Sequence, residues 1–275
     1  MRQARRVVLL RPAAPDVLVL AVLESEMIHY HGLPITPATA ARAAVSGGHA
    51  FVSFRYPDQL GLVLEVCQSF AVDNGAFSAW KSGEPVTDWT RYYEWVAELQ
   101  RYPNFDFAVI PDVIDGDEKA NDALVAEWPW RGTAKSGWVG APVWHMHESI
   151  DRLQRLAREW QRVCIGSSGQ YATVGDARWW DRIAEAMNAV CDKNGNPVCK
   201  LHGLRMLNPD VFSRLPFASA DSTNIARNVG IDSAWRGTYT PPSKECRALV
   251  MRERIESHQA TTFWQPQAVQ MVIAA

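Results

Sequence analysis

One pattern repeats along the chain from residue 27 to about residue 230. A short apolar segment ends in polar or glycine residues, and a segment with helical spacing follows. In IDRLQRLAREW, residues 150–160, apolar residues recur three and four positions apart, which is typical of one buried helix face. The strand-like segments begin MIHYHG, HAFVSF, SFAVDNG, FDFAVIPD, APVWHMH, RVCIGSSG, PVCKLHG and FASADS.

Strands that alternate with helices form parallel sheets. Eight such units in about 200 residues predict an α/β fold, specifically a (β/α)8 TIM-like barrel. The alternative is an open doubly wound sheet, but the chain carries no GxGxxG fingerprint to favour it.

The repeat also predicts the domain boundaries. Residues 1–26 form an N-terminal extension, residues 27–230 the TIM-like barrel, and residues 231–275 a C-terminal extension that packs on the barrel. The N-terminal extension resembles a signal peptide because its arginines precede an apolar run. Pro12, Pro15 and Asp16 interrupt that run, so we expect no signal peptide. Met27 is a second plausible start, and a protein beginning there is expected to fold.

Composition limits the classes of function. The formal net charge is -2, so no overall positive field indicates a nucleic-acid partner, although a local patch is compatible with one. The five cysteines are odd in number and scattered, which argues against a disulfide framework and favours a cytoplasmic protein. No segment approaches the ~20 apolar residues of a membrane span, so we expect no membrane partner.

Barrel enzymes place their chemistry at the carboxyl ends of the strands. Three of those positions here are aspartates, namely Asp73, Asp112 and Asp221. Each alone is equally explained as a helix cap, but three at one rim favour a functional site. Gly75 and Ala76 leave room for a flat ligand beside Asp73. The other candidates at strand ends are His145, His147, Gly166, Ser167, Ser168 and His202.

Four segments, in order, carry a resemblance to a known family: VDNGAF, IGSSGQY, LHGLRM and ADSTNIARNVG. Together they resemble the tRNA-guanine transglycosylase superfamily, which acts on queuine and archaeosine substrates. They are most similar to its short phage-type members, which exchange guanine for a 7-deazaguanine in DNA. The resemblance covers about residues 27–230 and implies a pentosyltransferase in the cytoplasm, or in the host cytoplasm if the chain is phage-encoded.

Breaking a glycosidic bond to a purine requires stabilisation of an oxocarbenium-like centre and a group that handles the departing base. One carboxylate can attack the anomeric carbon and form a covalent intermediate, while a second acts as acid or base. We assign Asp221 as the nucleophile and Asp73 as the general acid/base. Asp112 is expected to accept hydrogen bonds from the amino and ring N–H edge of a guanine-like base.

The resemblance adds further base-binding residues. His145 stands where the family often has a base-reading Gln; packing in the barrel mouth is the equal alternative for His145 and His147. Backbone amides of Gly166, Ser167 and Ser168 are expected to contact the base carbonyl, and Gly203 to give clearance to the ligand. Arg227 and Asn228 match the family's NARN segment and are assigned to the nucleic-acid backbone.

One departure from the family concerns metal. The tRNA enzymes carry a zinc site of CxCxxC with a later His, whereas only Cys246 and His258 lie in that region here. We therefore expect no zinc and no other cofactor. Because this short chain lacks the zinc module, DNA is the preferred partner and tRNA the alternative, with a 7-deazaguanine base as second substrate and a homodimer as an open option.

Two other classes of function remain open. A barrel hydrolase that cleaves a nucleoside or glycoside would use the same carboxylates but transfer the sugar to water. The protein could instead be a non-catalytic barrel that binds nucleic acid. Replacement of Asp221 would then have no effect on base exchange.

Overall fold

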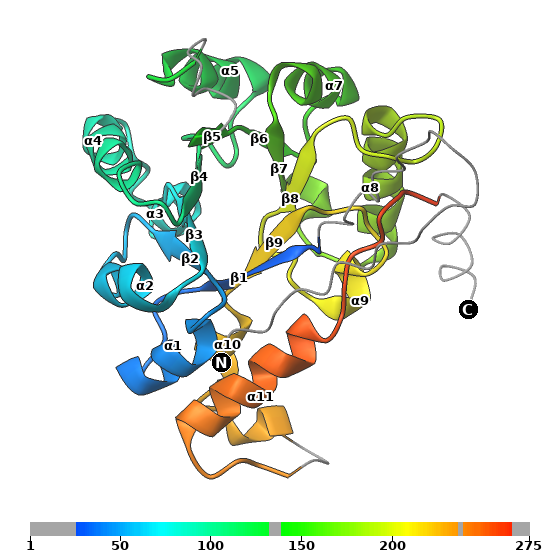
Figure 1. Ribbon diagram of the computed structural model, residues 1–275. Helices are drawn as coiled ribbons and strands as arrows, with labels where there is room; N and C mark the ends of the chain where they lie inside the picture. Colours follow the sequence, from blue (N-terminus) through cyan, green and yellow to red (C-terminus); the bar gives the residue numbers. More distant parts are fainter. Residues whose placement is uncertain (1–25, 132–138, 236–238, 266–275) are drawn as a thin grey trace, which may run out of the picture.

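The computed structural model describes residues 26–131, 139–235 and 239–265. Within them, parallel strands form a nearly closed barrel that is surrounded by helices (Figure 1). The strands are β1 (Ile28–Gly32), β2 (His49–Ser53), β3 (Ser69–Asp73), β4 (Phe105–Val109), β5 (Gly140–Ala141), β6 (Val143–His145), β7 (Arg162–Gly166), β8 (Lys200–Gly203) and β9 (Ser219–Ser222). This architecture confirms the predicted (β/α)8 TIM-like barrel.

The strand order explains how nine short strands make an eight-stranded barrel. The order is β5-β4-β3-β2-β1-β9-β8-β7-β6, so β5 and β6 stand at opposite ends of the hydrogen-bonded sheet. In sequence they are separated only by Pro142, which has no N–H to donate. β5 pairs with β4 and β6 pairs with β7. The two pieces therefore act as one interrupted fifth strand that brings the ends of the sheet together.

The helices lie outside the strands, as Figure 1 shows. They are α1 (Ala38–Val45), α2 (Leu60–Val66), α3 (Ala76–Lys81), α4 (Thr90–Leu99), α5 (Glu118–Glu127), α7 (Ile150–Glu159), α8 (Ala177–Val190), α9 (Pro209–Phe212), α10 (Asn224–Asn228) and α11 (Lys244–Glu256). Several begin at a side chain that accepts a backbone N–H, including Asp117 before α5, Ser149 before α7 and Asp176 before α8.

Alternation along the strands separates two apolar clusters. Side chains that face the barrel interior form a small cluster that includes Tyr30, Phe51, Phe107 and Cys164. Side chains that face outward pack with the helices into a much larger core. Tyr30 donates to Asp106 across the interior at 2.5 Å, and Arg162 also donates to Asp106 at 2.9 Å. The interior is therefore filled, and the open end that remains is the carboxyl rim.

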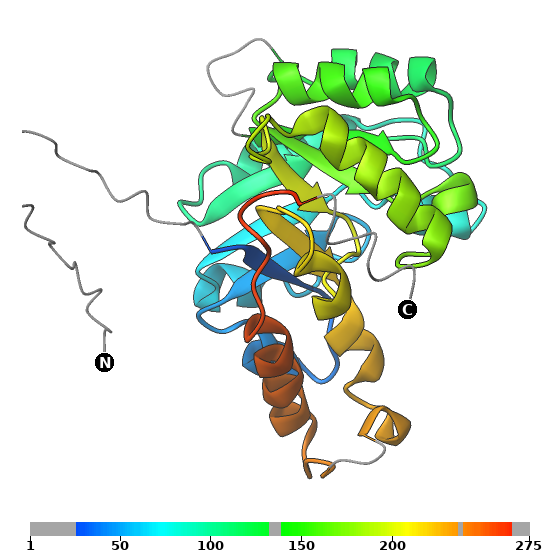
Figure 2. The same ribbon diagram turned by 90° about the vertical axis from the view of Figure 1, so that its right-hand side faces the viewer.

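The C-terminal segment packs on the barrel through α11. This helix lies beside α1 in Figure 1 and again in Figure 2. His31 on β1 lies 3.0 Å from the Glu256 carboxylate, which also accepts from Arg252 at 2.9 Å. Most of the predicted N-terminal extension, residues 1–25, lies outside the described residues. Across the part that the structure describes, no helix is long and apolar enough to cross a membrane.

Candidate active site

A cavity of about 650 Å³ opens at the carboxyl ends of the strands. Its walls include the three strand-end aspartates that the sequence nominates, Asp73, Asp112 and Asp221. The other predicted residues that line it are His145, Gly166, Ser167 and Arg227. Parallel strands of a barrel end at one rim, so residues far apart in sequence meet there.

Asp73 ends β3 and is held by its own turn. Its Oδ2 accepts from the Gly75 backbone N–H at 3.1 Å and from the Ser53 hydroxyl at 3.3 Å. Gly75 has φ +82°, a left-handed conformation that glycine adopts without a Cβ penalty. Burial, and then the negative charges of Asp112 and Asp221, raise the pKa of Asp73 to about 7. Asp73 therefore exchanges a proton near neutral pH.

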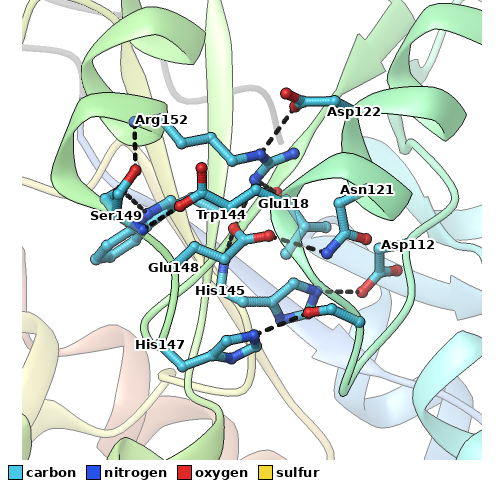
Figure 3. A network of polar contacts seen from close by, with 12 residues as sticks. Asp112, Glu118, Asn121, Asp122, Trp144, His145, His147, Glu148, Ser149 and Arg152 are labelled. Atoms are coloured by element: carbon cyan, nitrogen blue, oxygen red, sulfur yellow. Dashed lines mark hydrogen bonds and ion pairs between the residues drawn. The ribbon is translucent and has the colours of Figure 1, made fainter.

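Asp112 is a buried carboxylate whose two oxygens are both oriented. Asn74 donates its Nδ2 to Asp112 Oδ1 at 2.8 Å and to the Ile110 carbonyl at 3.0 Å. The Asn74 Oδ1 accepts from the Ala76 backbone at 2.7 Å, which fixes the amide orientation. His145 Nε2 lies 2.9 Å from Asp112 Oδ2 (Figure 3). The carboxylate plane is thus set by the strands on either side.

A buried polar network holds His145 in place. The carboxylate of Glu148 accepts from the His145 backbone N–H at 2.8 Å, from Asn121 at 2.9 Å and from Arg152 at 2.6 Å. Arg152 donates further to Asp122 at 2.9 Å. Figure 3 shows this network above His145 in the view, with Asn121 next to Asp112. A paired, hydrogen-bonded network of this kind restrains the strand end that carries His145.

Asp221 lies on β9 and is 4% exposed. Its Oδ1 accepts from the Arg205 backbone N–H at 2.8 Å, and His202 Nε2 lies 3.3 Å from the same oxygen. Burial lowers the pKa of His202, a shift that the Asp221 charge opposes, so a neutral imidazole faces Asp221 at neutral pH. No donor among the described residues contacts Asp221 Oδ2, which leaves that oxygen available to a ligand.

Three predicted residues are placed away from the cavity wall. Ser168 pairs its hydroxyl with His147 Nδ1 at 2.7 Å. A Cβ on Gly203 would approach Phe217 to 2.6 Å, so packing accounts for this glycine. Asn228 donates to the Asn224 side chain at 2.6 Å and lines a second cavity of about 390 Å³. Base contact by Ser168, clearance by Gly203 and backbone contact by Asn228 gain no support from these positions.

Two cavity residues escaped the sequence reasoning. Asn74 is buried and follows Asp73 directly, so its position next to a strand-end aspartate could have indicated it as a site residue. Arg205 lies two residues beyond β8 with φ 61°, and its guanidinium centre lies 4.1 Å from the Phe77 ring centroid. Nothing in the hydrophobic pattern predicts that backbone conformation, so Arg205 could not be assigned from sequence.

The described residues contain no group of three or more His, Cys, Asp or Glu side chains arranged to hold a metal ion. Burial raises the pKa of the Cys191 and Cys199 thiols to about 12, which keeps both protonated and poor as ligands.

Comparison with known proteins adds little to this geometry. No family model matches the chain, and no curated protein matches it. Among solved structures, a protein from Aquifex aeolicus VF5, described as "Structural study of Project ID", shares 10% identity with a TM-score of 0.45. The match covers 88% of this chain and 95% of that chain. The fold and the site by themselves define an α/β barrel with three carboxylates in its carboxyl-end cavity.

Proposed function

We propose that the protein is a base-exchange glycosyltransferase that replaces guanine in DNA with a 7-deazaguanine derivative through a covalent aspartyl-glycosyl intermediate. The observation that carries the proposal is the meeting of Asp73, Asp112 and Asp221 in one cavity. Burial, and then their proximity to one another, raises the pKa of one of them, Asp73, to about 7. Enzymes that cleave glycosidic bonds usually use one protonated carboxyl group as an acid and one ionised carboxylate as nucleophile or base.

The first half of the reaction breaks the bond to guanine. Asp221 Oδ2 attacks the anomeric carbon as the bond from that carbon to the base nitrogen breaks, which leaves the sugar esterified to Asp221. The departing nitrogen carries the bonding electron pair and takes the proton from neutral Asp73. The Arg205 N–H and the neutral His202 beside Oδ1 keep the carboxylate aimed while it reacts.

The second half reverses these roles. The ring N–H of the incoming 7-deazaguanine gives its proton to the Asp73 carboxylate, and its nitrogen attacks the anomeric carbon. The bond between that carbon and Asp221 then breaks, which regenerates the free carboxylate. A group with a pKa of about 7 serves as acid in one half and base in the other near neutral pH.

Asp112 is the proposed reader of the base. Guanine and a 7-deazaguanine present the same amino and ring N–H edge, and an ionised carboxylate only accepts hydrogen bonds. Asn74 donates to one of its oxygens and the His145 ring lies beside the other, an arrangement that suits a planar partner. The turn of Gly166 and Ser167 lines the same cavity and supports contact with the base carbonyl. One site can therefore accept both bases in turn.

The choice of DNA over tRNA rests on the sequence resemblance to the short phage-type members. The exposed guanidinium of Arg227 at the cavity supports a substrate that carries phosphate, which both polymers do.

The test is to incubate the protein with a labelled 7-deazaguanine and either guanine-containing DNA or tRNA. We expect label to enter DNA, Asp112→Asn to weaken base binding, and Asp88→Asn on the exposed surface to act like wild type. Label in tRNA alone would overturn the DNA assignment and keep the chemistry. Release of guanine without incorporation would point to the hydrolase, and no reaction with either polymer would overturn the proposal.

A further inference from the structure

Two arginines line the cavity beside Asp221. Arg205 lies in the loop after β8, and Arg227 lies on α10 after β9. β8 and β9 are neighbours in the sheet and form the seventh and eighth strands of the barrel, because β5 and β6 together form the fifth. In TIM barrels the loops after these two strands frequently build a phosphate site.

Arg205 is held in position by contacts of both its main chain and its side chain. Its backbone N–H donates to Asp221 Oδ1 at 2.8 Å, in the left-handed conformation at φ 61°. Its guanidinium centre lies 4.1 Å from the Phe77 ring centroid, within the range of a cation–π contact. The same residue therefore touches the proposed nucleophile with its main chain and presents a positive charge to the cavity.

Neither arginine forms an ion pair with an acid among the described residues. In the described part of the chain, no carboxylate lies within ion-pair distance of Arg205 or Arg227, whereas Arg247 pairs with Asp232 at 2.9 Å. Both residues are exposed at the cavity. Partial burial, and then the positive charge of Arg227, lower the pKa of Arg205, although the charges of Asp221 and Asp73 act in the opposite direction. The two guanidinium groups are therefore close enough to repel each other. An anion between them would relieve that repulsion.

We propose, building on the function proposed above, that Arg205 and Arg227 form a subsite for the phosphate that flanks the reacting nucleotide. A guanidinium presents several donors to phosphate oxygens in a fixed geometry. The Arg205 main chain donates to Asp221, so the Arg205 side chain starts close to the sugar that Asp221 would attack. The enzyme is thereby expected to take a nucleotide and to discriminate against a free nucleoside.

This assignment changes the pair expected from the sequence. Arg227 remains, but the amide of Asn228 is engaged by Asn224 in the smaller cavity. Arg205, from the neighbouring loop, takes the second position.

The test compares the affinities of 2′-deoxyguanosine, its 5′-monophosphate and its 3′-monophosphate by titration calorimetry. We expect one of the two monophosphates to bind wild type at least about tenfold more tightly than the nucleoside, as charge-assisted hydrogen bonds would give. Arg205→Gln and Arg227→Gln should each reduce that gain to about threefold or less. Arg205→Lys should retain part of it, and Lys81→Gln, which removes a cation from the same cavity, should retain all of it.

The proposal is overturned if neither phosphate improves binding, if Arg205→Gln leaves the gain unchanged, or if Lys81→Gln abolishes it to the same extent. A second measurement uses a guanine-containing oligonucleotide in fluorescence anisotropy over a range of salt. Loss of one phosphate contact should lower the slope of log affinity against log salt by about 1. Unchanged slopes in both arginine variants would also overturn the proposal, and unchanged melting curves will show that these exposed variants remain folded.

Failure of the subsite and failure of the proposed function are separable. A phosphate gain that depends on Arg205, in a protein that exchanges no base, would keep the subsite and remove the function. Base exchange at wild-type rate and KM in both arginine variants would keep the function and remove the subsite.

Discussion

Replacing Asp73 by Asn should stabilise the protein at neutral pH while it impairs catalysis. In the folded chain, burial and the charges of Asp112 and Asp221 raise the pKa of Asp73 from 3.8 to about 7. The folded state therefore binds this proton more tightly than the unfolded state does. The stability associated with the protonated group is fully present below pH 4 and is lost as the pH rises towards 7.

The size of this effect follows from the same two values. At about 1.4 kcal/mol per pKa unit, ionising Asp73 in place costs the fold about 4 kcal/mol. Most of that cost falls between pH 5 and pH 8, where it amounts to about 3 kcal/mol. Asn at this position does not ionise, so the variant has no such cost at any pH. The free energy of unfolding of Asp73→Asn, relative to wild type, should therefore rise by about 3 kcal/mol from pH 5 to pH 8.

Urea unfolding of both proteins at pH 5 and pH 8 measures this difference, in which the titration of unrelated groups cancels. Asp88→Asn is the matched control: Asp88 is exposed, and a hydrogen bond from the Thr90 backbone lowers its pKa. Asp88 is ionised at pH 5 and at pH 8 in both the folded and the unfolded state. The difference in unfolding free energy between Asp88→Asn and wild type should therefore be the same at both pH values. The base-exchange rate of Asp73→Asn should fall roughly 10²–10⁴-fold.

A stability difference between Asp73→Asn and wild type that does not change with pH would refute the raised pKa. Near-normal base exchange in the same variant would reduce Asp73 to a residue that shapes its turn through Gly75 and Ser53.

Three further predictions test other parts of the structure. Glu148→Ala should lower the free energy of unfolding by about 3–5 kcal/mol, because it leaves Arg152 buried without its closest carboxylate. Glu65→Gln, at an exposed ion pair, should lower it far less, and equal losses in urea unfolding would count against the network. Gly75→Ala should destabilise by about 1 kcal/mol or more because of its φ of +82°, whereas Gly61→Ala in α2, with open space around it, should stabilise by up to about 1 kcal/mol; the opposite order in thermal unfolding would contradict this. Purified protein should contain no stoichiometric zinc by elemental analysis, and one zinc per chain lost together with activity on chelation would show that prediction to be wrong.

Local patterns in the sequence account for most of the barrel. Apolar alternation and the residues that end each segment are local properties, so all eight strand segments could be located. The break at Pro142 was not foreseen, because which neighbour each half pairs with depends on closure of the whole sheet. The meeting of the strand-end aspartates followed from topology alone, since parallel strands end at one rim.

Other features of the site depend on contacts that the sequence does not display. Gly203 is small because Phe217, fourteen positions later, packs against it. Asn228 is turned away by a hydrogen bond to Asn224 within its own helix. Arg205 reaches Asp221 through a left-handed backbone conformation in a loop, where no periodicity operates. The rim that a strand end reaches can be predicted from the sequence because the sheet fixes the direction of its strands, whereas the direction of a loop side chain cannot.

In the proposed mechanism Asp221 becomes bonded to the sugar during turnover. Wild-type protein incubated with guanine-containing DNA should form an adduct that survives denaturation, and peptide mass mapping should place the added nucleotide on Asp221. Asp221→Asn should abolish both the adduct and base exchange, and addition of a 7-deazaguanine to the wild-type adduct should discharge it into modified DNA. Base exchange at an undiminished rate in Asp221→Asn, or an adduct that maps to another residue, would contradict the account.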